Sequence, residues 1–262
     1  MEAIDIGYTG LGLAYVLLIP PLAAVLWLRL PMLNRVAVAV VRMTVQLLLV
    51  GVYLQVLFDL QNAWLTALWL AVMIGVADVS IVRGCNLRLR RFAAPLALSL
   101  LAGTAVPMFY FVLALLRPDA LLAPRYVIPI GGMILGNCLR ADIIGIRTFY
   151  QGVDTARRSY RQRLAAGATF REAIRPYLRQ ACESALTPTV ASMTTIGLVA
   201  LPGMMTGVML GGTDPGVAIK YQIAIMLAIF CGTAITVVSA ILLTLRFAFD
   251  ARGNLDRDIF KR

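Results

Sequence analysis

Histidine is absent from the 262-residue sequence, which excludes histidine acid–base catalysis and histidine metal ligands. The four cysteines are scattered without CxxC spacing, so they indicate neither a disulfide framework nor a zinc site. Lysine occurs only at Lys220 and Lys261, and neither follows the GxxxxGKS/T pattern with which a phosphate-binding loop cradles ATP. We therefore expect no catalytic residue, no cofactor held by this chain, and no ATP hydrolysis by that route.

Acidic residues are few as well: 13 aspartates and glutamates stand against 24 lysines and arginines, and the net charge is +11. A strongly basic chain can bind nucleic acid. Here the arginines lie between long apolar runs, and the preference for positive charge on the cytoplasmic side of a membrane explains them better. No nucleic-acid partner is expected.

Apolar residues dominate what remains, at 60% of the chain and a mean hydropathy of +0.84. A soluble domain is normally about 45–50% apolar. The excess falls in runs of about 20 residues, the length that a helix needs to cross a bilayer. The sequence predicts an all-α polytopic membrane protein in which residues 1–262 form one transmembrane domain. Its predicted spans are 9–28, 36–58, 63–82, 92–116, 126–149, 186–210 and 217–245.

The distribution of basic residues predicts the orientation of these seven spans. One side of the membrane holds 18 lysines and arginines, in 29–35, 83–91, 151–185 and 246–262, whereas the other side holds 3. The richer side should be cytoplasmic, so the N-terminus is expected outside and the C-terminus inside. The first residues, MEAIDIGY, lack the positively charged region of a signal peptide.

The polar segment 151–185 predicts a cytoplasmic helical hairpin between spans five and six. Gly167 should end its first helix, and Thr169 with Glu172 has the capping-box pattern that starts the second. Pro176 lacks a backbone N–H, so we expect the second helix to break or kink there after about two turns. One apolar stripe should face the protein, comprising Val153, Ala156, Tyr160, Leu164, Phe170, Ile174, Leu178 and Ala181.

Polar and ionisable residues inside the predicted spans are candidates for a substrate path, because charge at membrane depth is costly unless it is paired or hydrated. Arg140 and Asp142 point to nearly opposite sides of one helix, so Asp78 is the expected partner of Arg42 or Arg140. The alternative is a structural ion pair near the inner boundary, with arginines reaching lipid phosphates. The candidates are Arg42, Gln46, Asp78, Asn137, Arg140 and Asp142.

Three glycines spaced four residues apart, Gly203, Gly207 and Gly211, predict a smooth ridge for close helix packing. Pro202 should kink the helix just before this ridge. Met204 and Met205 could touch a soft metal through their thioethers, but methionine in a span is more often a packing residue. No metal site can be read from the sequence.

Four motifs together resemble the Fet-type iron-export permeases: LPGMMTGVMLGGTDP, AIKYQ, IPIGGMILGN and RLAAGAT. Members of this family are membrane subunits of ABC transporters in bacteria, with plant relatives linked to aluminium tolerance. The resemblance covers essentially the whole chain. It implies a multi-pass permease of the inner membrane, paired with a separate subunit that holds ATP and Mg²⁺, exporting iron and helping under peroxide (oxidative) stress.

The segment LAAGATFREA also resembles the cytoplasmic EAA-type loop by which ABC permeases dock on their ATPase. Gly167 matches the glycine of that loop, whereas Arg161 stands where an acidic residue is expected and the following proline is displaced to Pro188. The match is therefore partial. The candidate coupling residues are Arg161, Arg163, Gly167, Thr169, Phe170, Arg171, Glu172 and Arg175.

Two other functions stay open at this point. A carrier of a small polar solute, driven by an ion gradient, would suit broken helices at Gly131–Gly132 and Pro202–Gly203, although no inverted repeat is visible. An intramembrane enzyme is disfavoured because no nucleophile–base constellation exists. For the permease we expect a homodimer with two ATPase subunits, joined through the glycine ridge, which moves a metal ion or a metal chelate.

Overall fold

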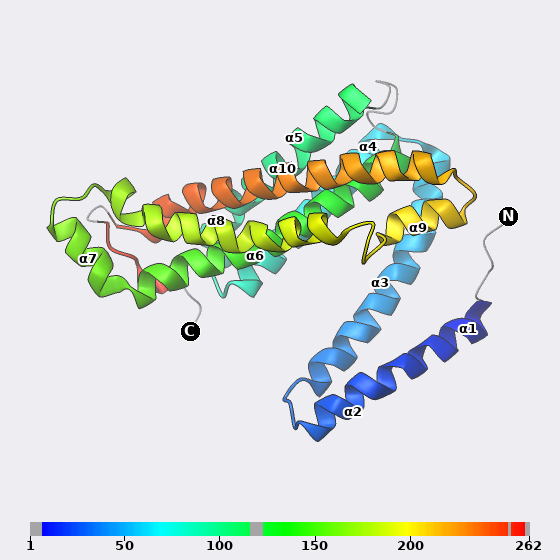
Figure 1. Cartoon of the computed structure of the whole chain (residues 1–262), viewed down its shortest axis with the longest axis horizontal. Helices are drawn as coiled ribbons and strands as arrows, with labels where there is room; N and C mark the ends of the chain where they lie inside the picture. Colours follow the sequence, from blue (N-terminus) through cyan, green and yellow to red (C-terminus); the bar gives the residue numbers. More distant parts are fainter. Residues whose placement is uncertain (1–6, 116–122, 251–252, 260–262) are drawn as a thin grey trace.

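The computed structural model describes residues 7–115, 123–250 and 253–259, and over these ranges it consists of helices and short connections, with isolated β-bridges in place of strands (Figure 1). The all-α fold predicted from the sequence is confirmed. The helices, in chain order, are α1 (Gly7–Ala14), η1 (Tyr15–Leu18), α2 (Ile19–Trp27), α3 (Leu33–Leu60), α4 (Ala63–Gly84), α5 (Leu89–Tyr110), the π-helical turn η2 (Phe111–Leu115), α6 (Pro124–Thr155), α7 (Arg157–Ala165), α8 (Phe170–Thr195), α9 (Gly203–Leu210), α10 (Pro215–Ala248) and η4 (Arg257–Ile259).

The core of the molecule lies where α5, α6 and α10 run side by side. Gly103 of α5 and Gly232 of α10 meet backbone to backbone, because a Cβ atom at Gly232 would stand only 2.5 Å from the Gly103 carbonyl oxygen. A Cβ atom at Gly103 would lie 2.7 Å from the Thr236 Cβ atom. Small residues let the two helices approach this closely, which is how helices gain contact in a bilayer.

Six helical segments in the described ranges are long and apolar enough to cross a membrane: Gly7–Trp27, Leu33–Leu60, Ala63–Gly84, Leu89–Leu115, Pro124–Thr155 and Pro215–Ala248. They agree with six of the seven predicted spans, although the predicted end of the fourth span at Leu116 lies outside the described residues. The protein is therefore a multi-pass helical membrane protein.

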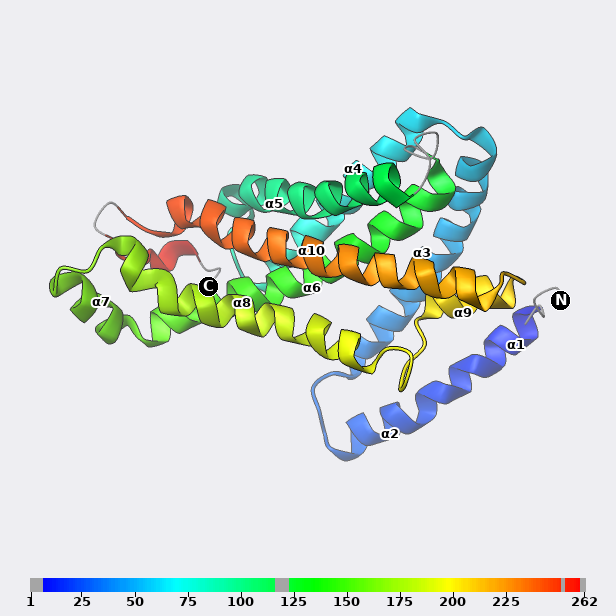
Figure 2. The ribbon, with the colours of Figure 1, turned by 45° about the horizontal axis from the view of Figure 1, so that its top comes forward.

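The predicted span 186–210 is not one helix. It consists of the end of α8, a non-helical stretch at 196–202, and the short α9. Gly197, with φ +84°, turns the backbone directly after α8. The chain nevertheless passes from one end of the bundle to the other here, because α7 and α9 lie at opposite ends in both views (Figure 1 and Figure 2). The crossing that the sequence predicts as a kinked helix is thus an interrupted one.

The predicted break at Pro176 is wrong, because α8 continues for 26 residues through both Pro176 and Pro188. Pro176 is exposed, so the carbonyl that it leaves without a helical partner stands at the surface of the bundle. On the opposite face, Ala173, Tyr177 and Ala181 are buried against the core. Packing along this face holds the helix together where local propensity alone predicts an interruption.

The hairpin itself is confirmed. Gly167 adopts φ +92° between α7 and α8. Thr169 and Glu172 form the expected capping box, in which the Thr169 N–H donates to Glu172 Oε2 at 2.8 Å and the Glu172 N–H donates to Thr169 Oγ1 at 3.3 Å. The Thr169 hydroxyl also donates to Glu172 Oε2, at 2.7 Å, and this bond together with the one from the Thr169 N–H lowers the pKa of Glu172. The predicted apolar stripe faces the core: Val153, Tyr160, Ile174 and Ala181 are buried, and Leu164, Phe170 and Leu178 pack beside them.

The N-terminal helices stand apart from the bundle (Figure 1 and Figure 2). The spanning windows of α1–α2 and of α3 bury no residue, and Leu57 is the buried side chain of α3. In α4, α5, α6 and α10, by comparison, the buried share of the same window is 28% to 50%. The first two spans are therefore solvated by lipid or by another chain rather than by the bundle.

Candidate functional site

A cavity of about 540 Å³ opens at mid-length of the bundle, beside the break between α8 and α9. Its walls come from α6, α8, α10 and the stretch 196–202. Polar side chains from three helices converge on it, namely Asn137, Arg140, Thr189, Ser192, Thr195 and Gln222. The apolar wall is formed by Met133, Ala141, Ile144, Ala185, Pro188, Ile196, Ala200, Leu201, Pro202, Gly203, Met226 and Ile229.

Arg140 is the charged residue of this lining. Sixteen residues separate it from the start of α6, so it lies about 24 Å along a helix of about 48 Å. In the described ranges, no carboxylate stands within 4.0 Å of its guanidinium and no hydrogen bond engages it. The expected ion pair with Asp78 is therefore absent, and the charge is available to the contents of the cavity.

The other predicted ionisable residues lie elsewhere. Asp142, next along α6, is fully buried and accepts a hydrogen bond of 2.8 Å from Thr236 Oγ1, while its second oxygen has no partner. Asp78 is 5% exposed on α4, and its Oδ1 also has no hydrogen-bond partner. Arg42 and Gln46 are exposed on α3 and line a separate groove on that helix. Of the six path candidates, Asn137 and Arg140 line the cavity, whereas Arg42 and Gln46 line only the groove on α3.

The polar wall of α8 and the side chain of α10 that faces it were not predicted from the sequence. Thr189, Ser192 and Thr195 repeat at helical spacing and place hydroxyls on one side of α8. This periodicity is visible in the sequence. However, serine and threonine are common in membrane helices and cost little free energy there, so the pattern alone does not indicate a site. Gln222, which is 8% exposed, has no comparable local signal, because it is one polar residue near the start of an apolar helix.

A second cavity, of about 290 Å³, lies between the starts of α6 and α10 and the short helix α9. Arg125, Tyr126, Met204 and Met205 contribute to its lining. Gln222 lines both cavities, so its side chain stands where the two approach each other.

The predicted glycine ridge lies on α9 and is open. Apart from the nearby backbone of α9 itself, no heavy atom in the described part of the chain comes within 4 Å of a Cβ atom built at Gly203 or at Gly207, and at Gly211 the neighbours are carbonyl oxygens of the same helix. Met205 is buried and Met204 half-buried, and both face the second cavity. Within this chain the ridge therefore packs against nothing.

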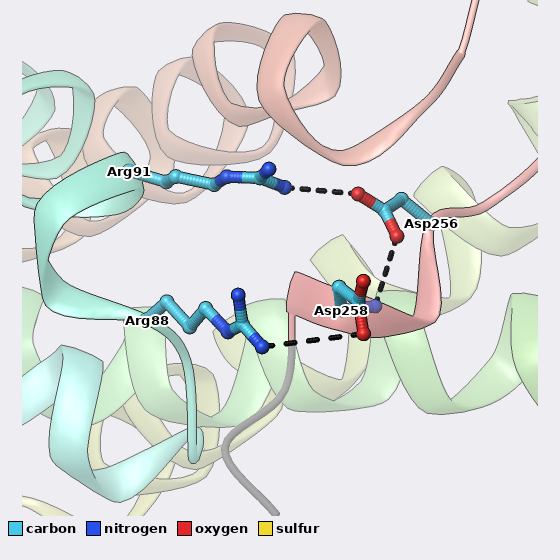
Figure 3. Close-up of polar contacts among 4 residues, drawn as sticks. All are labelled: Arg88, Arg91, Asp256 and Asp258. Carbon is cyan, nitrogen blue, oxygen red and sulfur yellow. Dashed lines mark hydrogen bonds and ion pairs between the residues drawn. The ribbon is translucent and has the colours of Figure 1, made fainter.

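At the other end of the bundle, the residues after α10 form a strap that crosses the hairpin and the start of α5. The strap comprises residues 249–250 and 253–259. Gly253 accepts a buried hydrogen bond of 2.7 Å from the Tyr160 hydroxyl of α7. Arg91 of α5 forms an ion pair of 2.9 Å with Asp256, and Arg88 stands 4.0 Å from Asp258 (Figure 3).

Aromatic side chains fill the space under this strap. Phe249 contacts the rings of Phe149, Tyr160 and Phe170, with centroid distances of 6.4, 6.2 and 5.2 Å. The candidate coupling residues therefore divide into two groups. Phe170 packs inward, and the others are exposed: Arg161, Arg163, Gly167, Thr169, Arg171, Glu172 and Arg175. The outer face of the hairpin is therefore rich in arginine.

Apolar spanning helices around a polar mid-depth cavity, with a charged hairpin at one end, define a multi-pass membrane protein of the permease class. The family described as "Uncharacterised protein family (UPF0014)" matches residues 8–249, and the chain belongs to this family. No solved structure matches the chain.

Three relatives illustrate the range of the family. The chain is 33% identical over 252 residues to "UPF0014 membrane protein slr1647" of Synechocystis, covering 96% of this chain and 97% of that protein. It is 32% identical over 214 residues to "Probable iron export permease protein FetB" of Escherichia coli, covering 82% and 81%. It is 34% identical over 189 residues to "Protein ALUMINUM SENSITIVE 3" of Arabidopsis thaliana, covering 72% and 67%. The family that the sequence motifs suggested is confirmed.

Proposed function

We propose that this chain is the membrane subunit of an ABC-type exporter that moves iron, or another metal, out of the cytoplasm. The name of the Escherichia coli relative supports both iron and the direction of transport. The polar cavity supports the passage of a hydrophilic substrate across the bundle. Export would lower the concentration of iron in the cytoplasm, and it would therefore reduce the reaction of iron with peroxide. The substrate is cargo, and the chain itself carries no resident metal or nucleotide in this proposal.

The hairpin is the observation that carries the proposal. Its arginine face is exposed, whereas its inner face is packed against the end of α10 and the strap through Tyr160, Phe170 and Phe249. A subunit that docks on the outer face can therefore push on the spanning helices through a continuous packed layer. We infer that a separate ATP-binding cassette subunit docks on 151–185 and holds the ATP and Mg²⁺.

Charge reversal on the hairpin tests this docking. The double variant Arg171→Glu/Arg175→Glu should lose co-purification with the ATPase encoded beside this chain and should abolish ATP-dependent transport in vesicles. The matched control is Arg83→Glu/Arg90→Glu, which reverses two arginines that are also exposed but lie outside the hairpin. Equal binding of the ATPase to both double variants would contradict docking on the hairpin.

We further propose that the working unit is a homodimer with two ATPase subunits. The open ridge on α9 and the unburied faces of α1–α3 leave room for a second copy. Gly207→Cys should give disulfide-linked dimers in the membrane. Gly75→Cys, at an equally open glycine of α4, is the control. Cross-linking at residue 75 but not at residue 207 would move the interface away from the ridge.

An ion-gradient carrier is the second candidate, and the interrupted helix beside the cavity favours it, because carriers bind substrate at such breaks. Vesicles separate the two mechanisms. Transport that requires ATP and the partner subunit supports the exporter. Transport by the chain alone, driven by a proton or sodium gradient, would replace the exporter with the carrier.

A further inference from the structure

The chemistry of the large cavity bears on what can pass through it. Among the described residues, its lining offers no carboxylate, no cysteine and no histidine, which are the side chains that hold most metal ions in proteins. The remaining metal donors of the wall are the thioethers of Met133 and Met226 and the neutral amide and hydroxyl oxygens of its polar residues. A bare divalent cation would therefore exchange its water shell for weak ligands only.

The charge of the cavity is positive. Arg140 brings a guanidinium to mid-depth, and the nearest acids in sequence and depth, Asp142 and Asp78, are buried outside the lining. Arg140 is exposed in this chain and has no acidic partner, so its charge disfavours a second cation in the cavity and favours an anion. The fork of five N–H donors fits a carboxylate or a phosphate in a bidentate manner.

The helix ends at the cavity add to this field. α9 begins at Gly203, which lines the cavity, and no side chain caps its first N–H groups. The positive end of the helix dipole is thus available there. At the carbonyl end of α8, two of the last four carbonyls have partners, since Ser192 O accepts from the Ile196 N–H and Thr195 O accepts from the N–H groups of Leu198 and Val199. The donors are free, and these acceptors are used.

We propose that the cavity selects an oxyanion, a carboxylate or phosphate group of the substrate, which binds to the Arg140 guanidinium and the N–H groups at the start of α9. This inference rests on the exporter function proposed above, and it specifies the substrate class: a metal would leave as a complex with net negative charge, and not as the hydrated cation. Asn137 and Gln222 supply amide groups that can bind the rest of such a ligand.

The test uses inside-out proteoliposomes that contain the full chain and its ATPase partner. Radiolabelled iron is offered either as the anionic citrate complex or as hydrated ferrous ion under reducing conditions, and labelled citrate is offered without metal. We expect ATP-dependent uptake of iron with citrate at least tenfold above that of the hydrated ion. Uptake of citrate alone at the same rate would identify the anion itself as the substrate, whereas uptake of citrate only with iron would identify the complex.

Variants of Arg140 test the binding residue. Arg140→Gln should reduce uptake of the citrate complex at least tenfold, and Arg140→Lys should retain part of it because the charge remains while the fork is lost. Arg90→Gln, which removes an exposed arginine away from the cavity, should leave uptake unchanged. Binding of citrate or inorganic phosphate to the purified protein, measured by calorimetry, should weaken in the same order.

The outcomes separate this inference from the proposed function. If iron moves with ATP equally well as the hydrated ion, or if Arg140→Gln transports the citrate complex normally, the oxyanion proposal is wrong while the exporter stands. If neither form of iron nor citrate moves with ATP, although citrate still binds in an Arg140-dependent manner, the exporter function fails and the anion site remains.

Discussion

The polar groups around the two ends of α8 differ in whether they have hydrogen-bond or ion-pair partners. At its start, the capping box, the Tyr160 hydroxyl and the ion pairs of the strap engage the polar groups, and rings fill the gaps between them. At its end, the helix stops beside a cavity in which Arg140 is unpaired. The contacts at the first end favour a single geometry. At the second end, the unpaired Arg140 guanidinium can bind a ligand and release it. The coupling of ATPase docking to transport proposed above would use both ends.

A substitution at the close crossing of α5 and α10 should have the largest effect on stability, because this contact lies in the core that joins the strap end of the bundle to the cavity end. Gly232→Ala places a methyl group against the Gly103 backbone, and we expect a loss of about 3 kcal/mol, the upper range for overpacking. Gly75→Ala has open space around it and should gain up to about 1 kcal/mol, because alanine favours a helix. Unfolding of the two variants in detergent measures the difference. Equal stability would show that α5 and α10 part easily.

Substitutions at the cavity end should change the rate of transport rather than the stability of the protein. Gln222→Leu removes the amide that lines both cavities, so we expect ATP-dependent uptake to fall several-fold while unfolding changes by less than about 1 kcal/mol. Ile223→Leu, an exposed neighbour on α10, is the control for the position. Uptake at the level of the unaltered chain in Gln222→Leu would mean that this amide takes no part in transport.

The strap end should respond in stability. Tyr160→Phe removes the buried hydrogen bond to the Gly253 carbonyl and should cost about 1 kcal/mol, the usual net value of one such bond. Tyr8→Phe, at an exposed tyrosine, should change nothing measurable. Hydrogen exchange of 253–259 should also rise in Tyr160→Phe. Unchanged exchange there would mean that the strap is held without this contact.

Acid should loosen the strap, and this is the smallest effect. The backbone N–H of Asp258 and the Arg91 side chain lower the pKa of Asp256 below its ordinary value. A carboxyl whose pKa is lowered by folding stabilises above its unfolded pKa, about 3.9, and this contribution disappears as the pH falls through the folded value. Protease cleavage within 250–259 should therefore increase below about pH 4, but not in Asp256→Asn, where it should already be raised at neutral pH.

Local patterns were predictable where their cause is local. The capping box of Thr169 and Glu172 and the turn at Gly167 depend on residues within one helical turn, so sequence reading found them. Pro176 was misjudged because burial of Ala173 and Tyr177 on the far side of α8 is a tertiary effect. The break at 196–202 was expected only as a kink, since nothing in Pro202 says that the backbone before it turns back at Gly197.

Composition and periodicity by themselves determined that this protein is helical, crosses a membrane several times and carries an arginine-rich hairpin, because hydrophobic length and cap patterns act within a segment. Only the tertiary structure decided which polar residues meet. The depth of a residue in a span follows from its position in the sequence, whereas the rotation of each helix about its axis follows from its neighbours. That rotation turns Arg140 to the cavity and Asp142 into the core.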